Sequence, residues 1–209
     1  MSPDFSHELA LQAQGFARIA PVDEVGRGPL AGPMMACAVV LDPAHIPEGL
    51  NDSKALTAKR REALTAEILR TAEVSIAEAS VAEIDTLNIL RASHLAMVRA
   101  LQGLSRLPDM ALIDGNLLPR DMPSPGRTLI KGDALSLSIA AASIVAKTTR
   151  DTLMMDLAQQ FPGYGWEKNA GYPSPAHKQA LLDLGVTPHH RRSFKPIHNI
   201  LYQAKTISD

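Results

Sequence analysis

Two apolar segments near the start of the chain, residues 18–25 and 34–41, are separated by only eight residues, three of which are glycines. Both segments are rich in Val, Ile and Ala and are bounded by Gly or Pro, which predicts two strands. The link is too short for the crossover helix that joins parallel strands. The two strands are therefore predicted to be antiparallel neighbours in one sheet.

The rest of the chain alternates between helical and strand-like patterns. Further strands are expected at 73–79, 110–113 and 128–130, and helices at 57–71, 81–104, 134–160 and 176–184. Residues 161–175 are rich in Gly, Pro and aromatic residues and predict a loop. This order predicts an α/β fold with a mixed sheet and helices on its faces.

The composition is that of an ordinary globular protein. The 209 residues carry 21 Lys and Arg against 22 Asp and Glu, a formal net charge of −1, and 45% of them are hydrophobic. This excludes a disordered or fibrous chain and a protein that binds nucleic acid through bulk positive charge. The single cysteine, Cys37, lies in an apolar strand and is expected in the core. It excludes an intramolecular disulfide and fits a reducing compartment.

Membrane and export signals are not found in the sequence. No apolar run approaches the roughly 18 residues that span a bilayer, and the N-terminus lacks the pattern of a signal peptide. We therefore expect a cytoplasmic protein. We also expect a monomer, because no exposed apolar helix face stands out in the pattern.

Carboxylates occur where predicted strands stop. Asp23 and Glu24 end the first strand, Asp114 ends the strand at 110–113, and Asp133 precedes the long helix. Four converging carboxylates need a neutralising cation, and oxygen ligands favour Mg²⁺ or Mn²⁺. Adjacent strand residues point to opposite faces, so the strand is expected to end or bulge at the Asp-Glu pair. Taken singly, Asp114 also fits a turn and Asp133 a helix cap.

The glycine-rich link does not have the context of a nucleotide-binding loop. Such a loop opens a helix, whereas here a strand follows. Gly26 and Gly28 instead allow the main chain to approach a ligand closely, and Arg27 adds a charge beside it.

Other polar and aromatic residues have two interpretations each. Ser143, Lys147 and Asp151 share one helix face, where Lys147 contacts a phosphate or pairs with Asp151. Asp151 is either that partner or a fifth acid near the metals. The basic residues 189–192 either follow a nucleic-acid backbone or belong to a segment docked by Phe194. Tyr164 and Trp166 are expected to pack in the interior.

Eight short segments, taken in order, resemble the type 2 ribonuclease H (ribonuclease HII) family. They are Asp23–Pro33, Asn51–Lys54, Ile113–Gly115, Lys131–Ala134, Ala142–Lys147, Thr149–Asp151, Gly171–Tyr172 and His190–Phe194. The resemblance runs from about residue 17 to about residue 195. One departure is Pro21, where the family pattern has Gly; proline removes a donor from the sheet ladder.

The resemblance implies a ribonuclease H-like fold with a five-stranded mixed sheet. Residues 1–209 would form one catalytic unit, with a core at about 16–160 and a C-terminal portion at about 161–209 that contributes to substrate binding. The metal-binding and catalytic acids would be Asp23, Glu24, Asp114 and Asp133. Substrate would be bound by Gly26, Arg27 and Gly28 at the ribose 2′-OH, by Tyr172 through stacking, and by Lys54, Ser143 and Lys147 at phosphates.

The implied substrates are RNA–DNA hybrids and duplex DNA with embedded ribonucleotides. Two Mg²⁺ or Mn²⁺ ions would activate a water and stabilise the leaving 3′-oxygen, giving a 3′-hydroxyl and a 5′-phosphate. Two alternatives remain: another metal nuclease of this fold, such as a junction resolvase or transposase, and a non-catalytic nucleic-acid-binding module. The Gly-Arg-Gly segment with Tyr172 argues against the first, and the complete set of four acids against the second.

Overall fold

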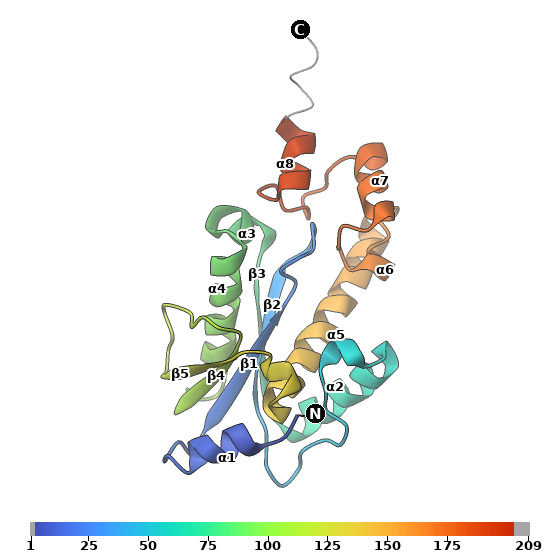
Figure 1. Cartoon of the computed structure of the whole chain (residues 1–209). Coiled ribbons are helices and arrows are strands. Elements are labelled where there is room, and N and C mark those ends of the chain that lie inside the picture. Colours follow the sequence, from blue (N-terminus) through green and yellow to red (C-terminus); the bar gives the residue numbers. More distant parts are fainter. Residues whose placement is uncertain (1–2, 203–209) are drawn as a thin grey trace.

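The computed structural model describes residues 3–202, which form a five-stranded mixed sheet with helices on both faces (Figure 1). The strands are β1 (Ile19–Val25), β2 (Met34–Val40), β3 (Glu73–Ala79), β4 (Met110–Asp114) and β5 (Gly126–Leu129). They lie in the order β3-β2-β1-β4-β5. β2 is antiparallel to β1 and β3, and β4 is parallel to β1 and β5. The predicted antiparallel pair and the predicted mixed sheet are confirmed.

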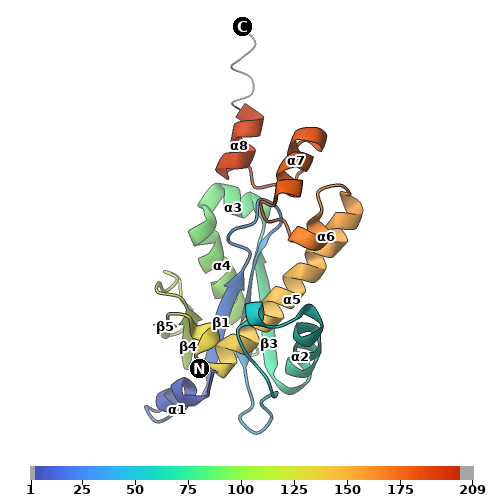
Figure 2. The same ribbon diagram turned by 45° about the vertical axis from the view of Figure 1, so that its right-hand side comes forward.

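The two faces of the sheet carry different helices (Figures 1 and 2). The helices are α1 (Ser6–Gln12), α2 (Ala58–Thr71), α3 (Val81–Leu87), α4 (Ile89–Gln102), α5 (Leu137–Gln160), α6 (Trp166–Asn169), α7 (Pro175–Leu184) and α8 (Lys195–Tyr202). One apolar cluster joins the sheet to α3 and α4, and another joins it to α2 and α5. The buried run Ala140–Ala146 lets α5 lie close to the sheet, because its side chains are mostly small.

The predicted helix at 81–104 is in fact two helices. Asn88 has φ 73°, a left-handed conformation that breaks the ladder between α3 and α4. Its side chain then caps α4 by accepting from the amides of Leu90 and Arg91. The long helix α5 likewise begins later than predicted, because Ser136 caps it and residues 132–134 form a separate 3₁₀ turn.

Pro21 lies inside β1 without disturbing the sheet. The paired residues of β1 and β2 begin at Val22 and Ala38, immediately after the proline. On its other side Pro21 stays in register with Leu112 of β4. The missing amide donor therefore falls just before the antiparallel ladder begins.

The C-terminal helices α6, α7 and α8 gather at one end of the sheet, opposite α1 (Figures 1 and 2). They enclose an apolar cluster of their own, which includes Trp166, Leu181 and Ile197 and also takes in Leu30 and Ala31 from the β1–β2 link. Residues 1–2 and 203–209 of the predicted catalytic unit lie outside the described residues. Between residues 3 and 202, no helix is long and apolar enough to cross a membrane.

Candidate active site

The sheet topology brings the predicted carboxylates to one edge. Asp23 and Glu24 lie near the end of β1, and Asp114 is the last residue of β4. Since β1 and β4 are parallel neighbours, their carboxyl ends meet at the same edge. Asp133 sits in the 3₁₀ turn at 132–134, and the amide of Gly132 donates to the Asp114 carboxylate at 2.7 Å. That bond holds the turn carrying Asp133 at the end of β4.

Asp23 and Glu24 are both in regular strand pairing. Asp23 is opposite Cys37 and Glu24 opposite Ala36, so the ladder has no bulge at the pair, and β1 ends one residue later at Val25. The two side chains therefore leave the sheet toward opposite faces. Asp23 faces α5, where the nearby Ser143 hydroxyl opposes the rise in its pKa.

Burial makes these carboxylates unusually hard to ionise. The pKa of Asp23, which is 5% exposed, is raised well above its ordinary value by burial and then by the charges of Glu24 and Asp114. Burial and the charge of Asp114 raise the pKa of Glu24, although Arg27 opposes them. Burial also raises the pKa of Asp114, with the Asp133 charge adding to it. A bound cation would relieve all of these penalties.

The donor atoms fit a hard divalent cation. All four groups are carboxylates, and Glu24 Oε2 is buried with no hydrogen-bond partner among the described residues. Within residues 3–202, no three His, Cys, Asp or Glu side chains are already arranged around a common point for an ion.

Lys54 and Ser143 both lie beside the carboxylates, but Lys54 is exposed and Ser143 is buried. The Lys54 side chain is 79% exposed, and its Nζ is 3.4 Å from Asp133 Oδ2. Partial burial acts to lower the pKa of Lys54, but the charges of Asp133 and Asp52 outweigh it and raise that pKa. Ser143 is buried, and its hydroxyl is 2.9 Å from the hydroxyl of Ser53. Ser143 is thus held by Ser53 close to Asp23, and the phosphate contact that the resemblance implies for it stays a prediction.

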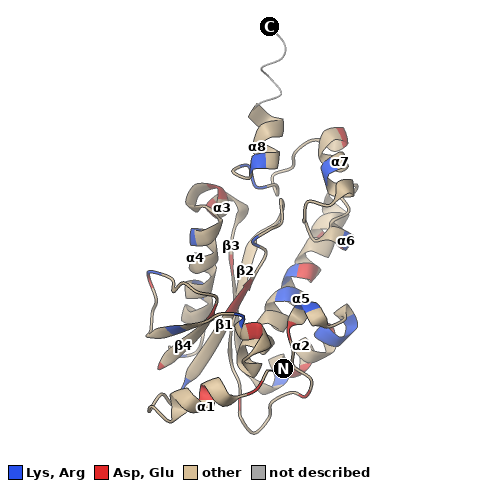
Figure 3. Cartoon of the chain, in the orientation of Figure 1, with Lys and Arg blue, Asp and Glu red and all other residues tan. Residues whose placement is uncertain are grey.

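Lys147 pairs with Asp151 at 2.7 Å, as one of the two sequence interpretations expects. Asp151 is also 3.5 Å from Nη2 of Arg61 in α2. Arg61 Nη1 donates to the carbonyls of Ser53 (3.1 Å) and Leu56 (2.7 Å). Arg61 therefore ties the segment that carries Lys54 to the helix that carries Lys147. Lys and Arg gather on α2 and on the middle of α5 (Figure 3).

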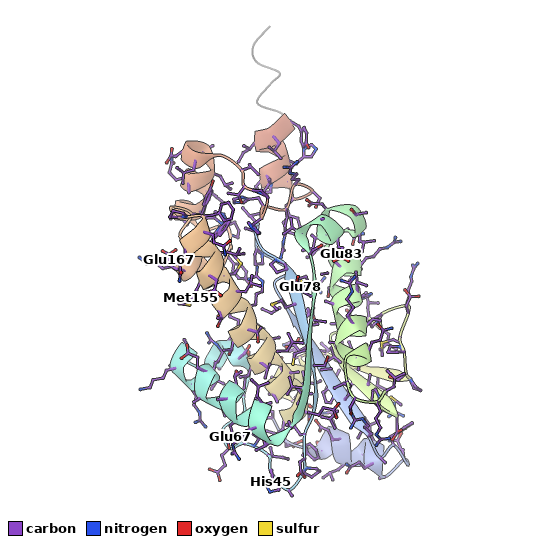
Figure 4. The ribbon with its side chains drawn as sticks, turned by 180° about the vertical axis from the view of Figure 1, so that it is seen from behind. His45, Glu67, Glu78, Glu83, Met155 and Glu167 are labelled. Atoms are coloured by element: carbon purple, nitrogen blue, oxygen red, sulfur yellow. The ribbon has the colours of Figure 1, made fainter. Side chains whose placement is uncertain are left out.

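A cavity of about 350 Å³ opens beside this ion-pair network. Its lining includes Arg61, Lys147 and Asp151 together with Tyr172. Met155 and Glu167 form part of the rim, where α5 meets α6 (Figure 4). The cavity thus leads from the ion pairs to the exposed aromatic ring of Tyr172.

The predicted 2′-OH reader and the predicted stacking residue are in contact. A Cβ added to Gly28 would lie 3.2 Å from Cε1 of Tyr172, so the ring rests against this glycine. At Gly26 (φ 100°) a Cβ would lie 2.5 Å from Nε of Arg150. Arg27 is exposed between them, with Nη1 3.5 Å from Glu24 Oε1. Tyr172 is 42% exposed, which leaves its ring available to a ligand.

Two buried arginines that hold the glycine-rich link were not predicted. Arg150 donates to the carbonyls of Pro33 (3.0 Å), Ala31 (2.9 Å) and Ala170 (3.0 Å). Arg191 donates to those of Gly32 (2.9 Å), Pro33 (3.2 Å) and Arg27 (3.3 Å). Burial lowers the pKa of Arg150 to about 10 and that of Arg191 to about 9. Their partners are main-chain carbonyls, which every residue has, so the sequence does not predict these contacts.

The basic residues at 189–192 are largely structural. His190 and Arg191 are fully buried, and the guanidinium of Arg191 lies 5.2 Å from the centre of the Phe194 ring. The interpretation in which Phe194 docks this segment therefore holds, and that of a strip following a nucleic-acid backbone is wrong for His190 and Arg191. Tyr164, Trp166 and Cys37 are buried, as expected.

Comparison with known proteins agrees with the fold and with the order of the motifs. The family model of ribonuclease HII matches residues 20–197. A ribonuclease HII of Cereibacter sphaeroides is 68% identical over 206 residues, which are 99% of this chain and 97% of that protein. One of Ruegeria pomeroyi is 69% identical over 201 residues, covering 96% and 86%.

Among solved structures, the ribonuclease H2 of Pyrococcus horikoshii is similar with a TM-score of 0.76 and 28% identity, covering 90% of this chain and 99% of that one. The sheet order and flanking helices described above are thus shared with a ribonuclease H2. From residue 20 to residue 197 the chain belongs to the ribonuclease HII family, and it is an endonuclease of the ribonuclease H type.

Proposed function

We propose that this endonuclease hydrolyses the RNA strand of RNA–DNA hybrids and incises 5′ of single ribonucleotides embedded in duplex DNA. The observation that carries the proposal is the contact of Tyr172 with Gly28 beside the carboxylate edge. The 2′-OH distinguishes RNA from DNA, and main-chain groups flanked by glycine can reach it without steric conflict. The aromatic ring can stack against the adjoining sugar or base. Such incision would serve the removal of ribonucleotides during DNA replication and repair.

Asp23, Glu24, Asp114 and Asp133 hold two Mg²⁺ or Mn²⁺ ions in this proposal. Divalent ions held there would supply activation of a water and stabilisation of the leaving 3′-oxygen, and the products would carry a 3′-hydroxyl and a 5′-phosphate. Ser143, whose hydroxyl is 2.9 Å from that of Ser53, contacts a substrate phosphate in this proposal.

The lysines supply the positive charge that meets the substrate backbone. Lys54 is mostly exposed beside Asp133 and can turn to a phosphate without breaking a close contact. Lys147 contacts a second phosphate from the cavity next to Tyr172. The portion at 161–209 contributes to binding through Tyr172. We propose that the enzyme works as a monomer, and its free buried Cys37 supports a reducing, cytoplasmic location.

The test is an incision assay on three duplexes: a long RNA–DNA hybrid, a DNA duplex with one ribonucleotide, and an all-DNA duplex. We expect cleavage of the first two with Mg²⁺ or Mn²⁺ and none with EDTA. Asp23→Asn should abolish cleavage, whereas Asp121→Asn, which makes the same change at an exposed position, should leave it intact.

Each alternative function has its own outcome in this assay. Cleavage of the all-DNA duplex would favour a resolvase-like or transposase-like nuclease. Binding of all duplexes without cleavage under any metal condition would favour a non-catalytic module. Full activity of Asp23→Asn with Mg²⁺ present would overturn the assignment of the carboxylates.

A further inference from the structure

His177 in α7 is a fully buried histidine with three hydrogen-bond contacts. Its Nδ1 lies 2.9 Å from the main-chain carbonyl oxygen of Tyr172. Its Nε2 lies 3.1 Å from Nε1 of Trp166 and 3.1 Å from Nε2 of His190. The imidazole therefore connects the segment carrying Tyr172 to the interior of the C-terminal portion.

The partners of His177 determine where its proton lies. The indole N–H of Trp166 can only donate, so Nε2 of His177 accepts. The single proton of the neutral ring is then on Nδ1, which donates to the Tyr172 carbonyl. His190 fits the same pattern, because its Nδ1 accepts from the amide of Thr187 at 3.0 Å and its Nε2 carries the proton toward His177.

The main chain on the N-terminal side of the Tyr172 carbonyl is held by other bonds: the Tyr172 amide donates to the carbonyl of Asn169 at 2.8 Å, and the Gly171 carbonyl accepts from the amide of Leu30 at 2.8 Å. The Tyr172 carbonyl itself also accepts from the amide of Ser174 at 2.8 Å, within the same turn. The bond from His177 is the side-chain contact that ties this carbonyl to a helix. Because the Tyr172 ring is 42% exposed and rests on Gly28, its position depends on where the main chain is placed.

We propose that His177 is a positioning residue for Tyr172: its Nδ1–H, fixed by the donors Trp166 and His190 at Nε2, holds the Tyr172 carbonyl so that the ring stays against Gly28. The inference rests on the proposed function, in which Tyr172 stacks on the substrate next to the ribonucleotide. His177 itself is buried and does not touch the substrate. A lost or displaced hydrogen bond of this kind should therefore act on catalysis only through Tyr172.

Two amide variants test the two ring nitrogens of His177 one at a time. His177→Asn places an amide nitrogen close to the position of Nδ1 and keeps a donor to Tyr172. His177→Gln places its amide close to the position of Nε2 and keeps a partner for Trp166, but it has no donor to Tyr172. We expect His177→Gln to lower kcat/KM about tenfold on DNA with one ribonucleotide, and His177→Asn to restore most of that loss.

Fluorescence of Trp166 reports on the Nε2 side of His177 in the same two variants, and it should respond to the variant that leaves activity nearly intact. Trp166 is the single tryptophan of the chain, so its emission reports the contact with Nε2. The emission should change in His177→Asn and stay close to the wild type in His177→Gln. A residue that merely fills space would lower activity in proportion to stability in both variants, and that result would overturn the inference.

A double-mutant cycle with Tyr172→Ala completes the test. In the Tyr172→Ala background, His177→Gln should cost no further kcat/KM, because its route to the substrate is gone. An equal loss in both backgrounds would contradict the inference and leave the proposed function untouched. If Tyr172→Ala alone changes neither activity nor substrate preference, the proposed stacking role fails instead.

Trp166→Phe gives a second route should the His177 variants fold poorly. It removes one of the two donors to Nε2 of His177, leaving Nε2 of His190 as the other, and keeps the histidine. We expect a smaller loss of kcat/KM in the same direction, absent in the Tyr172→Ala background. A loss that persists in that background would count against the inference.

Discussion

At the scale of single residues, the burial of the Asp23 carboxylate costs folding free energy. Its carboxylate is buried among Glu24 and Asp114, and burial raises its pKa well above the ordinary range. Without a cation, the folded protein holds a charge that water would solvate better. An uncharged side chain of the same shape would avoid this cost.

We therefore predict that Asp23→Asn raises the free energy of unfolding by roughly 0.5–2 kcal/mol in EDTA, although it abolishes activity. Urea denaturation followed by Trp166 fluorescence measures the effect. Asp121→Asn, at an exposed position, should change the free energy of unfolding little. A less stable Asp23→Asn protein in EDTA would contradict this account of the carboxylate edge.

Which residues were predictable depends on the kind of partner that each one has. Asp23, Glu24, Asp114 and Asp133 stand where strands stop, and that position is visible in the sequence. His177, Arg150 and Arg191 act on main-chain carbonyls elsewhere in the chain. A carbonyl belongs to every residue, so no pattern of side chains identifies these partners.

At the scale of elements, Arg61 couples α2 to α5. It donates to the carbonyls of Ser53 and Leu56 and reaches Asp151, the partner of Lys147. The planar guanidinium serves these acceptors together, which a lysine ammonium on a flexible stem does not.

Arg61→Lys keeps the positive charge but loses the planar guanidinium that bonds both carbonyls and reaches Asp151. We predict a KM for the ribonucleotide-containing duplex raised about threefold to tenfold and a free energy of unfolding lowered by about 1–2 kcal/mol, because two carbonyl contacts lose their donors. Arg60→Lys is the matched control, since Arg60 is the exposed neighbour with one carbonyl contact, to Glu48. Equal effects of the two substitutions would show that charge alone matters.

Most helices and strands follow from the local pattern of apolar residues, and the exceptions have identifiable physical causes. The pattern predicts a single helix at 81–104 because the apolar spacing continues across Asn88, whose left-handed φ alone marks the break. The short helices α1 and α8 were not predicted, although Ile197, Ile200 and Leu201 of α8 have helical spacing and pack in one apolar cluster. α1 is nevertheless anchored, because Glu8 is buried and accepts from the amide of Ser138 at the start of α5. Glu8 and Ser138 are 130 residues apart in the sequence, so a local pattern does not reveal this contact.

At the scale of the whole molecule, neutral histidines help to hold the C-terminal portion together. Burial, followed by the charge of His177, lowers the pKa of His190 from 6.5 to about 4. Between these values the unfolded chain binds a proton that the folded chain does not. The stability contributed by His190 is therefore complete above about pH 6.5 and is lost as the pH falls toward about 4.

We predict that the free energy of unfolding decreases on acidification through this range, with His190 contributing up to about 1.4 kcal/mol per pH unit. His190→Gln should be less stable than the wild type at neutral pH, and the difference should shrink at lower pH. His45→Gln, in an exposed loop at the opposite end of the molecule (Figure 4), should keep the wild-type slope. A wild-type slope in His190→Gln would refute the assignment.

The bond from Arg191 to Gly32 spans 159 residues of the chain. During synthesis the glycine-rich link leaves the ribosome early, and Arg191 leaves it only after the whole sheet and the helices α1 to α7. Until then the carbonyls of Gly32 and Arg27 lack the guanidinium that holds them. A nascent chain therefore has the strands and turns that carry its four carboxylates before Arg191 fixes the conformation of the glycine-rich link.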